Sequence, residues 1–135
     1  MSEFKKASTQ RINGFPIGGR VYFKHYFDDR DIFSELSSYY NSSEYRFELP
    51  MDALPEVRGF LDDEGYGLVV VSEPREFAVV KRKFTEHPDS IFRNSVVMRD
   101  TSDFHVFLMK DRDAVEQALI NGASRLSSTD LDIEF

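Results

Sequence analysis

Residues 44–71, EYRFELPMDALPEVRGFLDDEGYGLVVV, contain the patterns that decide the fold of this chain. From Tyr45 to Leu49, apolar and charged residues alternate, as they do in a strand with one buried face. A helical stripe of apolar residues follows over about 52–63, and Gly65 suits the position just after a helix. Residues 68–71 are apolar on both faces, which is typical of a central strand. The stretch therefore predicts a strand, a helix and a second strand.

Elements of the same two kinds are expected on either side. Residues 21–27 have the period of a strand with an aromatic outer face, and the carboxylates at the start of 28–40 favour a helix there. Further strands are predicted at 77–84 and, as a hairpin, within 95–109. A last helix over 113–122 has Asp113 as its expected cap and ends at a glycine.

This order of elements predicts an α+β fold. We expect a mixed, largely antiparallel sheet of five to six strands, with three helices packed mainly on one face. The length of 135 residues is that of a single domain, here 1–135. Within it, the polar and glycine-rich residues 1–19 are predicted to form a flexible arm, and 124–135 a tail or an edge strand.

Composition narrows the class of protein further. Acidic residues number 24 against 17 basic ones, which gives a net charge of -7, and there is no cysteine. Such a charge opposes binding to polyanions unless the basic residues gather on one face. The absence of cysteine excludes thiol catalysis and disulfides. Because no apolar leader follows the N-terminus, we expect a cytoplasmic protein.

Aromatic residues suggest a protein-interaction surface. Tyr22, Tyr26, Tyr39 and Tyr40 provide more aromatic surface than one sheet face readily buries. Aromatic side chains are enriched at protein interfaces. The first hypothesis is therefore a non-enzymatic interaction or regulatory module that binds a protein partner or a second copy of itself.

A basic run supports an alternative hypothesis of nucleic-acid binding. The candidate residues are Lys81, Arg82, Lys83, Arg93 and Arg99. If their strands pair, these side chains form one positive patch, and Tyr22 and Tyr26 are available for stacking on bases. A lattice of cross-strand salt bridges explains the same residues, and the net charge favours the lattice.

A second alternative is a small enzyme centred on His87. Glu86 and Asp89 flank it, and a carboxylate beside an imidazole raises its basicity, which suits a general base. A turn at Pro88-Asp89 explains the same residues without catalysis. The histidines lack metal-ligand spacing, so neither a metal nor a cofactor is expected.

Two resemblances add to these hypotheses. Residues 80–88 (VKRKFTEHP), 92–95 (FRNS), 106–111 (VFLMKD) and 114–118 (AVEQA) resemble small proteins of halophilic archaea, which implies a salt-rich cytosol but no particular activity. The tail 130–135 resembles the acidic tips of single-stranded-DNA-binding proteins, which recruit partner proteins. An edge strand accounts for the same alternation.

Overall fold

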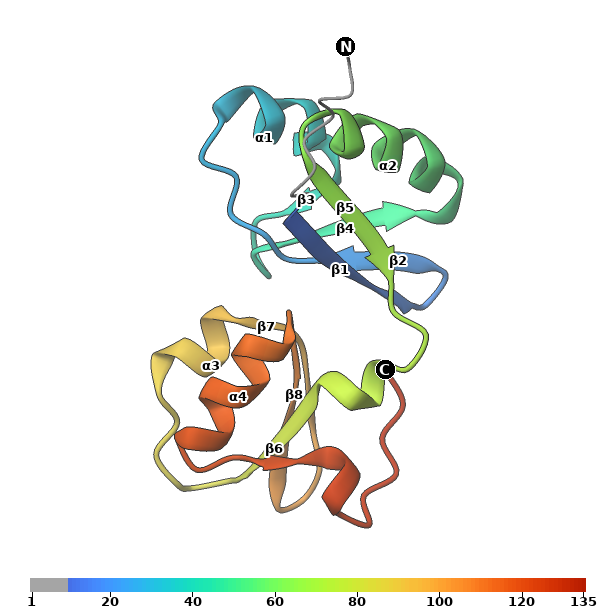
Figure 1. Ribbon diagram of the computed structural model, residues 1–135. Coiled ribbons are helices and arrows are strands. Elements are labelled where there is room, and N and C mark those ends of the chain that lie inside the picture. The colour runs from blue at the N-terminus through green and yellow to red at the C-terminus, as the bar shows by residue number, and fades with distance from the viewer. Residues whose placement is uncertain (1–9) are drawn as a thin grey trace. The chain divides into compact units, whose positions relative to one another are not determined.

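The computed structural model describes residues 10–135, and residues 1–9 lie outside the described part of the chain. The chain divides into two compact units, Met1–Val71 and Ser72–Phe135, where a single domain was expected. Each unit builds its own sheet (Figure 1). The α+β class is therefore confirmed, but its strands belong to two sheets instead of one.

The N-terminal unit contains a mixed five-stranded sheet in the order β3-β4-β2-β1-β5. Its elements are β1 (Gln10–Ile17), β2 (Arg20–Phe23), α1 (Arg30–Leu36), a 3-10 turn (Ser37–Tyr39), β3 (Tyr40–Asn41), β4 (Arg46–Pro50), a 3-10 turn (Met51–Ala53), α2 (Leu54–Asp63) and β5 (Tyr66–Val70). Strands β1 and β5 are parallel, and the other neighbours are antiparallel.

The core of this unit lies on the face of the sheet that carries both helices. Cross-strand neighbours on β2 and β4, such as Val21 with Leu49 and Phe23 with Phe47, bury their side chains there. Helix α1 adds Ile32 and Leu36, and helix α2 adds apolar side chains from its inner stripe. The alternation seen in the sequence of 45–49 thus marks a real buried face, because successive side chains of a strand point to opposite sides.

The expected arm over 1–19 is wrong for residues 10–19. These residues form β1 and its turn into β2, and Ile12 and Phe15 are buried. Gly14, expected within the flexible arm, lies in β1 and allows close packing: a Cβ there would lie 2.7 Å from Cγ1 of Val21. The glycine therefore lets two strand faces approach each other.

Two strand predictions in this unit need correction. The strand expected over 21–27 ends at Phe23, and the chain then runs as coil to the cap of α1, where Asp29 accepts a hydrogen bond from the N–H of Asp31. The apolar residues 68–71 were expected in the centre of a sheet. Their strand β5 lies instead at its edge.

The C-terminal unit is a split β-α-β arrangement with an antiparallel sheet in the order β7-β8-β6-β9. Its elements are a 3-10 turn (Pro74–Phe77), β6 (Ala78–Arg82), α3 (Asp89–Arg93), β7 (Ser95–Asp100), β8 (Phe104–Met109), α4 (Arg112–Ile120), β9 (Ser124–Arg125) and a 3-10 turn (Leu126–Ser128). The predicted hairpin within 95–109 is confirmed, since β7 pairs with β8.

One helix boundary in this unit differs from the expected one, and one predicted edge strand is present. Helix α4 is capped by Asp111, which accepts a hydrogen bond from the N–H of Ala114, and not by Asp113. Asp113 lies inside the first turn, where a carboxylate also favours the helix dipole. The segment 124–135 begins as the expected edge strand, because Ser124 and Arg125 pair with β6. No helix within residues 10–135 has the length and apolar character needed to cross a membrane.

Candidate binding surfaces

An aromatic pocket of about 780 Å³ opens in the N-terminal unit, between the coil after β2 and helix α1. The residues that line this aromatic pocket are His25, Tyr26, Phe27, Arg30, Asp31, Phe33, Ser34, Ser37 and Tyr40. Phe33 and Tyr40 meet edge to face with ring centroids 5.1 Å apart. Tyr26 is 84% exposed and Phe33 is 38% exposed, so aromatic surface remains open to solvent.

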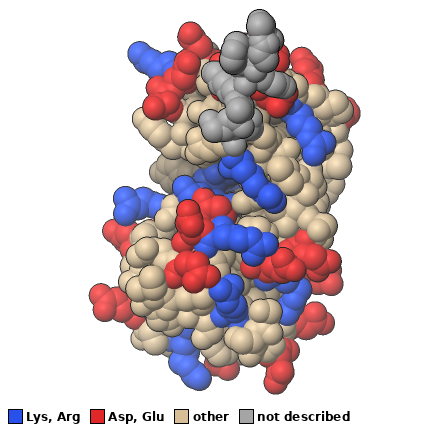
Figure 2. Space-filling model, in the orientation of Figure 1, with Lys and Arg blue, Asp and Glu red and all other residues tan. Residues whose placement is uncertain are grey.

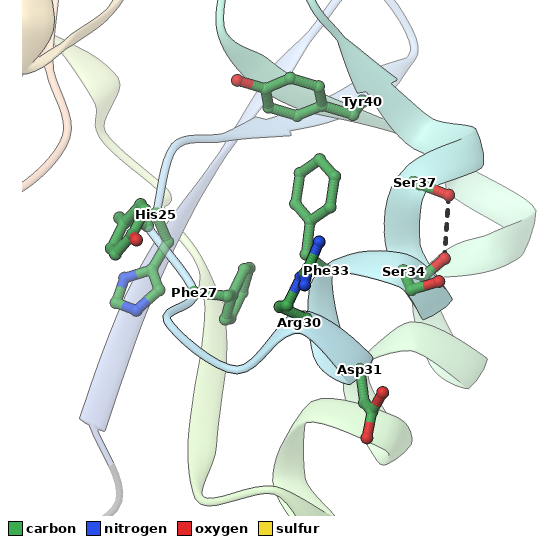
Figure 3. Close-up of a pocket in the computed structure, with 9 residues that line it drawn as sticks. His25, Phe27, Arg30, Asp31, Phe33, Ser34, Ser37 and Tyr40 are labelled. Atoms are coloured by element: carbon green, nitrogen blue, oxygen red, sulfur yellow. Dashed lines mark hydrogen bonds between the residues drawn. The ribbon is translucent and has the colours of Figure 1, made fainter.

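Polar groups enter the same pocket beside the rings. Arg30 is exposed and lines the pocket beside Phe33, and in Figure 3 Asp31 points away from Tyr40. His25 is half-buried, and the centre of its ring lies 4.7 Å from that of Phe27. Apolar walls with a few convergent polar groups are typical of a ligand pocket.

A second hollow, of about 490 Å³, lies in the same unit between helix α2 and strand β5. This α2–β5 groove is lined by Pro55, Arg58, Gly59, Asp62, Tyr66, Gly67 and Leu68. The four helix residues follow the spacing of one helical face. Nε of Arg58 donates a hydrogen bond of 3.1 Å to the carbonyl oxygen of Leu68, so the helix side chain reaches the backbone of the strand.

The pKa of Tyr66, the first residue of β5, depends on charges in the coil before α1. Burial raises the pKa of its phenol, and the negative charges of Asp28, Asp29 and Glu64 raise the pKa further. Both causes act in the same direction, because each disfavours the phenolate anion. The neighbourhood of the strand's first residue is therefore negatively charged.

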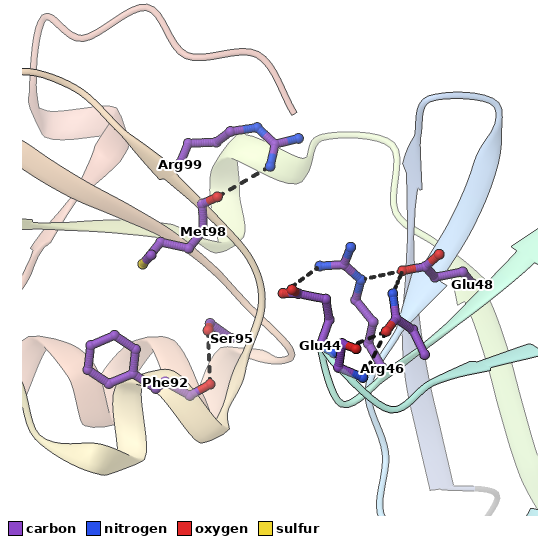
Figure 4. Close-up of polar contacts among 9 residues, drawn as sticks. Glu44, Arg46, Glu48, Phe92, Ser95, Met98 and Arg99 are labelled. Carbon is purple, nitrogen blue, oxygen red and sulfur yellow. Dashed lines mark hydrogen bonds and ion pairs between the residues drawn. The ribbon is translucent and has the colours of Figure 1, made fainter.

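The face of this sheet that lies away from the helices carries a polar network (Figure 4). Glu48 accepts hydrogen bonds from Nε of Arg46 at 2.8 Å and from Nδ2 of Asn41 at 2.9 Å. Burial raises the pKa of Glu48, but these two hydrogen bonds together with the charges of Arg46 and Arg20 outweigh it and lower the pKa overall. The guanidinium of Arg46 also lies 4.4 Å from the ring centre of Tyr22.

The structure separates the two tyrosines that were expected to share one face. Tyr22 lies under Arg46 on the face away from the helices, whereas Tyr26 follows the end of β2 and lines the aromatic pocket. Tyr40 lines that pocket too. Tyr39 lines a smaller hollow between α1 and α2. The predicted aromatic surface is thus divided, and only Tyr26 and Tyr40 come together.

The five basic candidates do not form one patch. Lys81 and Arg82 are consecutive in β6 and point to opposite faces. Nζ of Lys81 donates to the carbonyl of Asn121, while Arg82 lies over the ring of Phe104. Strand β8 separates β6 from β7, which carries Arg99, so the strands do not pair directly as the patch required. Acidic and basic side chains are also interspersed on the face seen in Figure 2.

The remaining two basic candidates lie on separate segments. Lys83 follows β6 in the turn, where its N–H donates to the carbonyl of Asp103. Arg93 is the last residue of α3. The alternative of a single nucleic-acid-binding patch therefore loses its geometric basis.

His87 finds a partner that was not expected. Its Nδ1 donates to the carbonyl of Thr85 at 2.7 Å, and its Nε2 lies 3.0 Å from Nδ1 of His105. Since the carbonyl can only accept, a neutral His87 accepts at Nε2 and His105 is the donor. Within residues 10–135, neither Glu86 nor Asp89 hydrogen bonds to His87. The imidazole of His87 is thus hydrogen bonded to Thr85 and His105, and the expected contact with a carboxylate of Glu86 or Asp89 is not among its hydrogen bonds in the described part of the chain.

The C-terminal segment 126–135 covers one face of its own sheet. Leu126 is buried against Ala78, Val80 and Val106, and the alternating residues Leu131, Ile133 and Phe135 pack against the same cluster. The guanidinium of Arg75 donates to the carbonyls of Leu131 and Ile133 at 3.2 and 3.3 Å. The period-two pattern of the tail thus reflects packing, because every second side chain faces the sheet.

Sequence reasoning missed the α2–β5 groove and the histidine pair. Arg58 and Gly59 lie on the outer face of α2, whereas the sequence pattern identified only its buried face. The glycine inside the helix was the one feature of the sequence that could have indicated an open surface there. His87 and His105 are brought together only by the pairing of β6 with β8. Comparison with protein families, with curated proteins and with solved structures finds no match to this chain.

Proposed function

We propose that the protein is a non-enzymatic interaction module that binds a partner protein at the aromatic pocket of its N-terminal unit. The observation that supports this proposal is the pocket of about 780 Å³ with partly exposed aromatic walls at Tyr26 and Phe33. A partner side chain that is large and apolar fits these walls. Exposed aromatic and arginine side chains are the groups that most often dominate the binding energy of protein interfaces.

The chemistry of the pocket narrows the partner motif. Arg30 lines the pocket and is exposed, so a carboxylate next to the inserted apolar side chain would pair with its guanidinium. Asp31 also lines the pocket, and Asp28 and Asp29 precede Arg30 in the chain, so additional negative charge on the partner is disfavoured. We therefore expect a motif with one aromatic residue and one adjacent acidic residue.

The chain contains no tryptophan, which gives a direct assay. A random peptide library with a fixed central tryptophan serves as the probe, and the fluorescence of the selected peptides reports binding without a background from the protein. Phe33→Ala and Arg30→Gln should each weaken binding at least about tenfold, the size of effect typical of an interface hot spot. Tyr45→Ala is the matched control, because Tyr45 is 67% exposed and lies outside the pocket. Equal losses in all three variants, or no selected peptide, would contradict the proposal.

A further inference from the structure

Strand β5 has the composition of a central strand but occupies an edge of its sheet. Its sequence is YGLVV, with no charged residue, no proline and no break in register along β1. Within residues 10–135, no strand pairs with its other side. Natural proteins usually protect edge strands with charge, proline, bulges or short length, because an open edge is a template for another strand.

The register shows which backbone groups the edge offers. Gln10 donates to the carbonyl of Gly65 at one end of the β1–β5 ladder, and Val71 donates to the carbonyl of Gly14 at the other. In a parallel ladder, alternate residues bond to the neighbouring strand. Between these two bonds, Gly67 faces β1 together with Val69. The N–H and C=O groups of the three intervening residues point to the edge; these are Tyr66, Leu68 and Val70.

The α2–β5 groove runs beside these groups. The Arg58 side chain already reaches one of them, the carbonyl of Leu68, from the helix. In the free chain, the Nε–H of Arg58 satisfies the carbonyl oxygen of Leu68. A backbone N–H of an added strand would replace this donor. Helix, groove and edge strand together have the arrangement in which an extended peptide adds to a sheet and lays alternate side chains against a helix.

Gly59, on the helix side of the groove, has open space beside it. It lies in the middle of α2, where glycine is less favourable than alanine by about 1 kcal/mol. A Cβ at this position would have nothing within 4 Å, so no packing contact requires glycine. Its backbone is helical and does not require glycine either. The space beside Gly59 is open, so a larger side chain at this position would extend into the groove.

From these observations we infer that β5 and α2 bind an extended segment of a partner protein by strand addition, with an acidic residue of that segment opposite Arg58. This site is separate in its residues from the aromatic pocket. A second copy of the chain is a poorer occupant. Symmetric antiparallel pairing about Leu68 would bring the two Arg58 side chains together at the same carbonyls, where like charges repel.

The experiment uses the full chain and a random library of twelve-residue peptides. Peptides selected on the wild type are tested for slowed hydrogen exchange at the amides of Tyr66, Leu68 and Val70. We expect protection at these three amides and an acidic residue in the selected peptides. Replacing that acidic residue by lysine should weaken binding to the wild type and strengthen binding to Arg58→Glu, since the charges are then exchanged.

Two variants of Gly59 make the test decisive. Gly59→Ala should keep binding within about threefold, whereas Gly59→Leu should fold equally well but bind at least about tenfold more weakly, because the larger side chain fills the groove. Stability is checked by thermal unfolding of each variant. The inference is overturned if no peptide is selected, if the three amides exchange as in the free chain, or if Gly59→Leu binds normally. Peptides lost on Phe33→Ala but not on Gly59→Leu belong to the aromatic pocket and would also overturn it.

Discussion

The two units end their sheets in different ways. In the C-terminal unit, β9 is two polar residues long, and β7 carries a register shift between Ser95 and Val97. In the N-terminal unit, β3 has only two residues, but β5 has five and none is charged. Three of the four described edge strands are thus short or irregular. Short length and irregular register both protect an edge strand against further pairing. The exception is β5, whose other side pairs with no strand within residues 10–135.

The two units also differ in how the faces of their sheets are covered. The C-terminal unit covers its open face with segment 126–135, held by Arg75. The N-terminal unit keeps an aromatic pocket and a groove accessible. The C-terminal unit thus covers a second sheet face with its own chain, although Phe84 and Ile120 remain exposed in that unit, whereas the aromatic pocket and the α2–β5 groove lie in the N-terminal unit.

The largest expected effect concerns the framework that positions β5. Phe47 is 1% exposed and its ring contacts Phe23 and Phe27, with centroids 4.8 and 5.8 Å away. Phe47→Ala should lower the free energy of unfolding by about 3–5 kcal/mol, because it removes buried apolar surface and leaves a cavity. Denaturant unfolding measures the change. Tyr45→Ala, at an exposed neighbouring position, should stay within about 0.5 kcal/mol, and a similar loss in both variants would contradict the described core.

The next-largest loss of stability is expected where segment 126–135 covers the sheet of the C-terminal unit. Arg75→Gln removes the charged donors to Leu131 and Ile133 and should destabilise the unit by about 1–2 kcal/mol. Amide exchange within 129–135 should accelerate, since the segment is then held by apolar packing alone. Arg112→Gln is the control, because it removes an exposed contact of 3.5 Å with Glu76 and the contact of the guanidinium with the Phe77 ring, neither of which involves residues 129–135. If exchange in the segment is unchanged, the cover does not depend on Arg75.

The polar network of the N-terminal unit predicts a pH dependence. The pKa of Glu48 is lowered in the folded chain, so its stabilising contribution is present above the pKa of the unfolded chain. The contribution is lost as the pH falls through the lowered folded pKa. We expect a loss of at most about 1 kcal/mol, because the network is partly exposed. Glu48→Gln should remove this part of the acid sensitivity, and an unchanged pH profile of stability in that variant would contradict the assignment.

The smallest effect concerns the acidic end of α2 beside β5. Asp63 is the last residue of the helix, where a carboxylate opposes the helix dipole. Asp63→Asn should raise stability by about 0.3–0.5 kcal/mol at low salt. Molar potassium chloride should close this difference and stabilise the wild type, because salt screens the unfavourable charge interactions. A difference that does not change with salt would argue against an electrostatic origin.

Local patterns predicted much of the fold. The alternation over 45–49 and the stripe of α2 both describe elements that exist, because burial imposes periodicity on strands and helices. The division into two sheets was not predicted, since periodicity carries no information on which strands pair. For the same reason, the apolar residues of β5 suggested a central strand, although the strand lies at an edge.

The candidate sites were predicted less well. Tyr26 does line a pocket, but the rings around it come from a coil, a helix and a strand that only the fold brings together. The basic residues failed as a patch because strand parity separates Lys81 from Arg82. Arg58 and Gly59 do not form a recognisable sequence motif. Their groove exists because this face of α2 lies beside β5, and the sequence alone does not show that neighbour.

Residue-resolved hydrogen exchange of β5 in the free chain tests the central claim most directly. The open-edge account predicts an alternating pattern, with slow exchange at Gly67 and Val69 and fast exchange at Tyr66, Leu68 and Val70. Uniformly slow exchange along the whole strand would mean that the edge is already paired, and it would contradict the account.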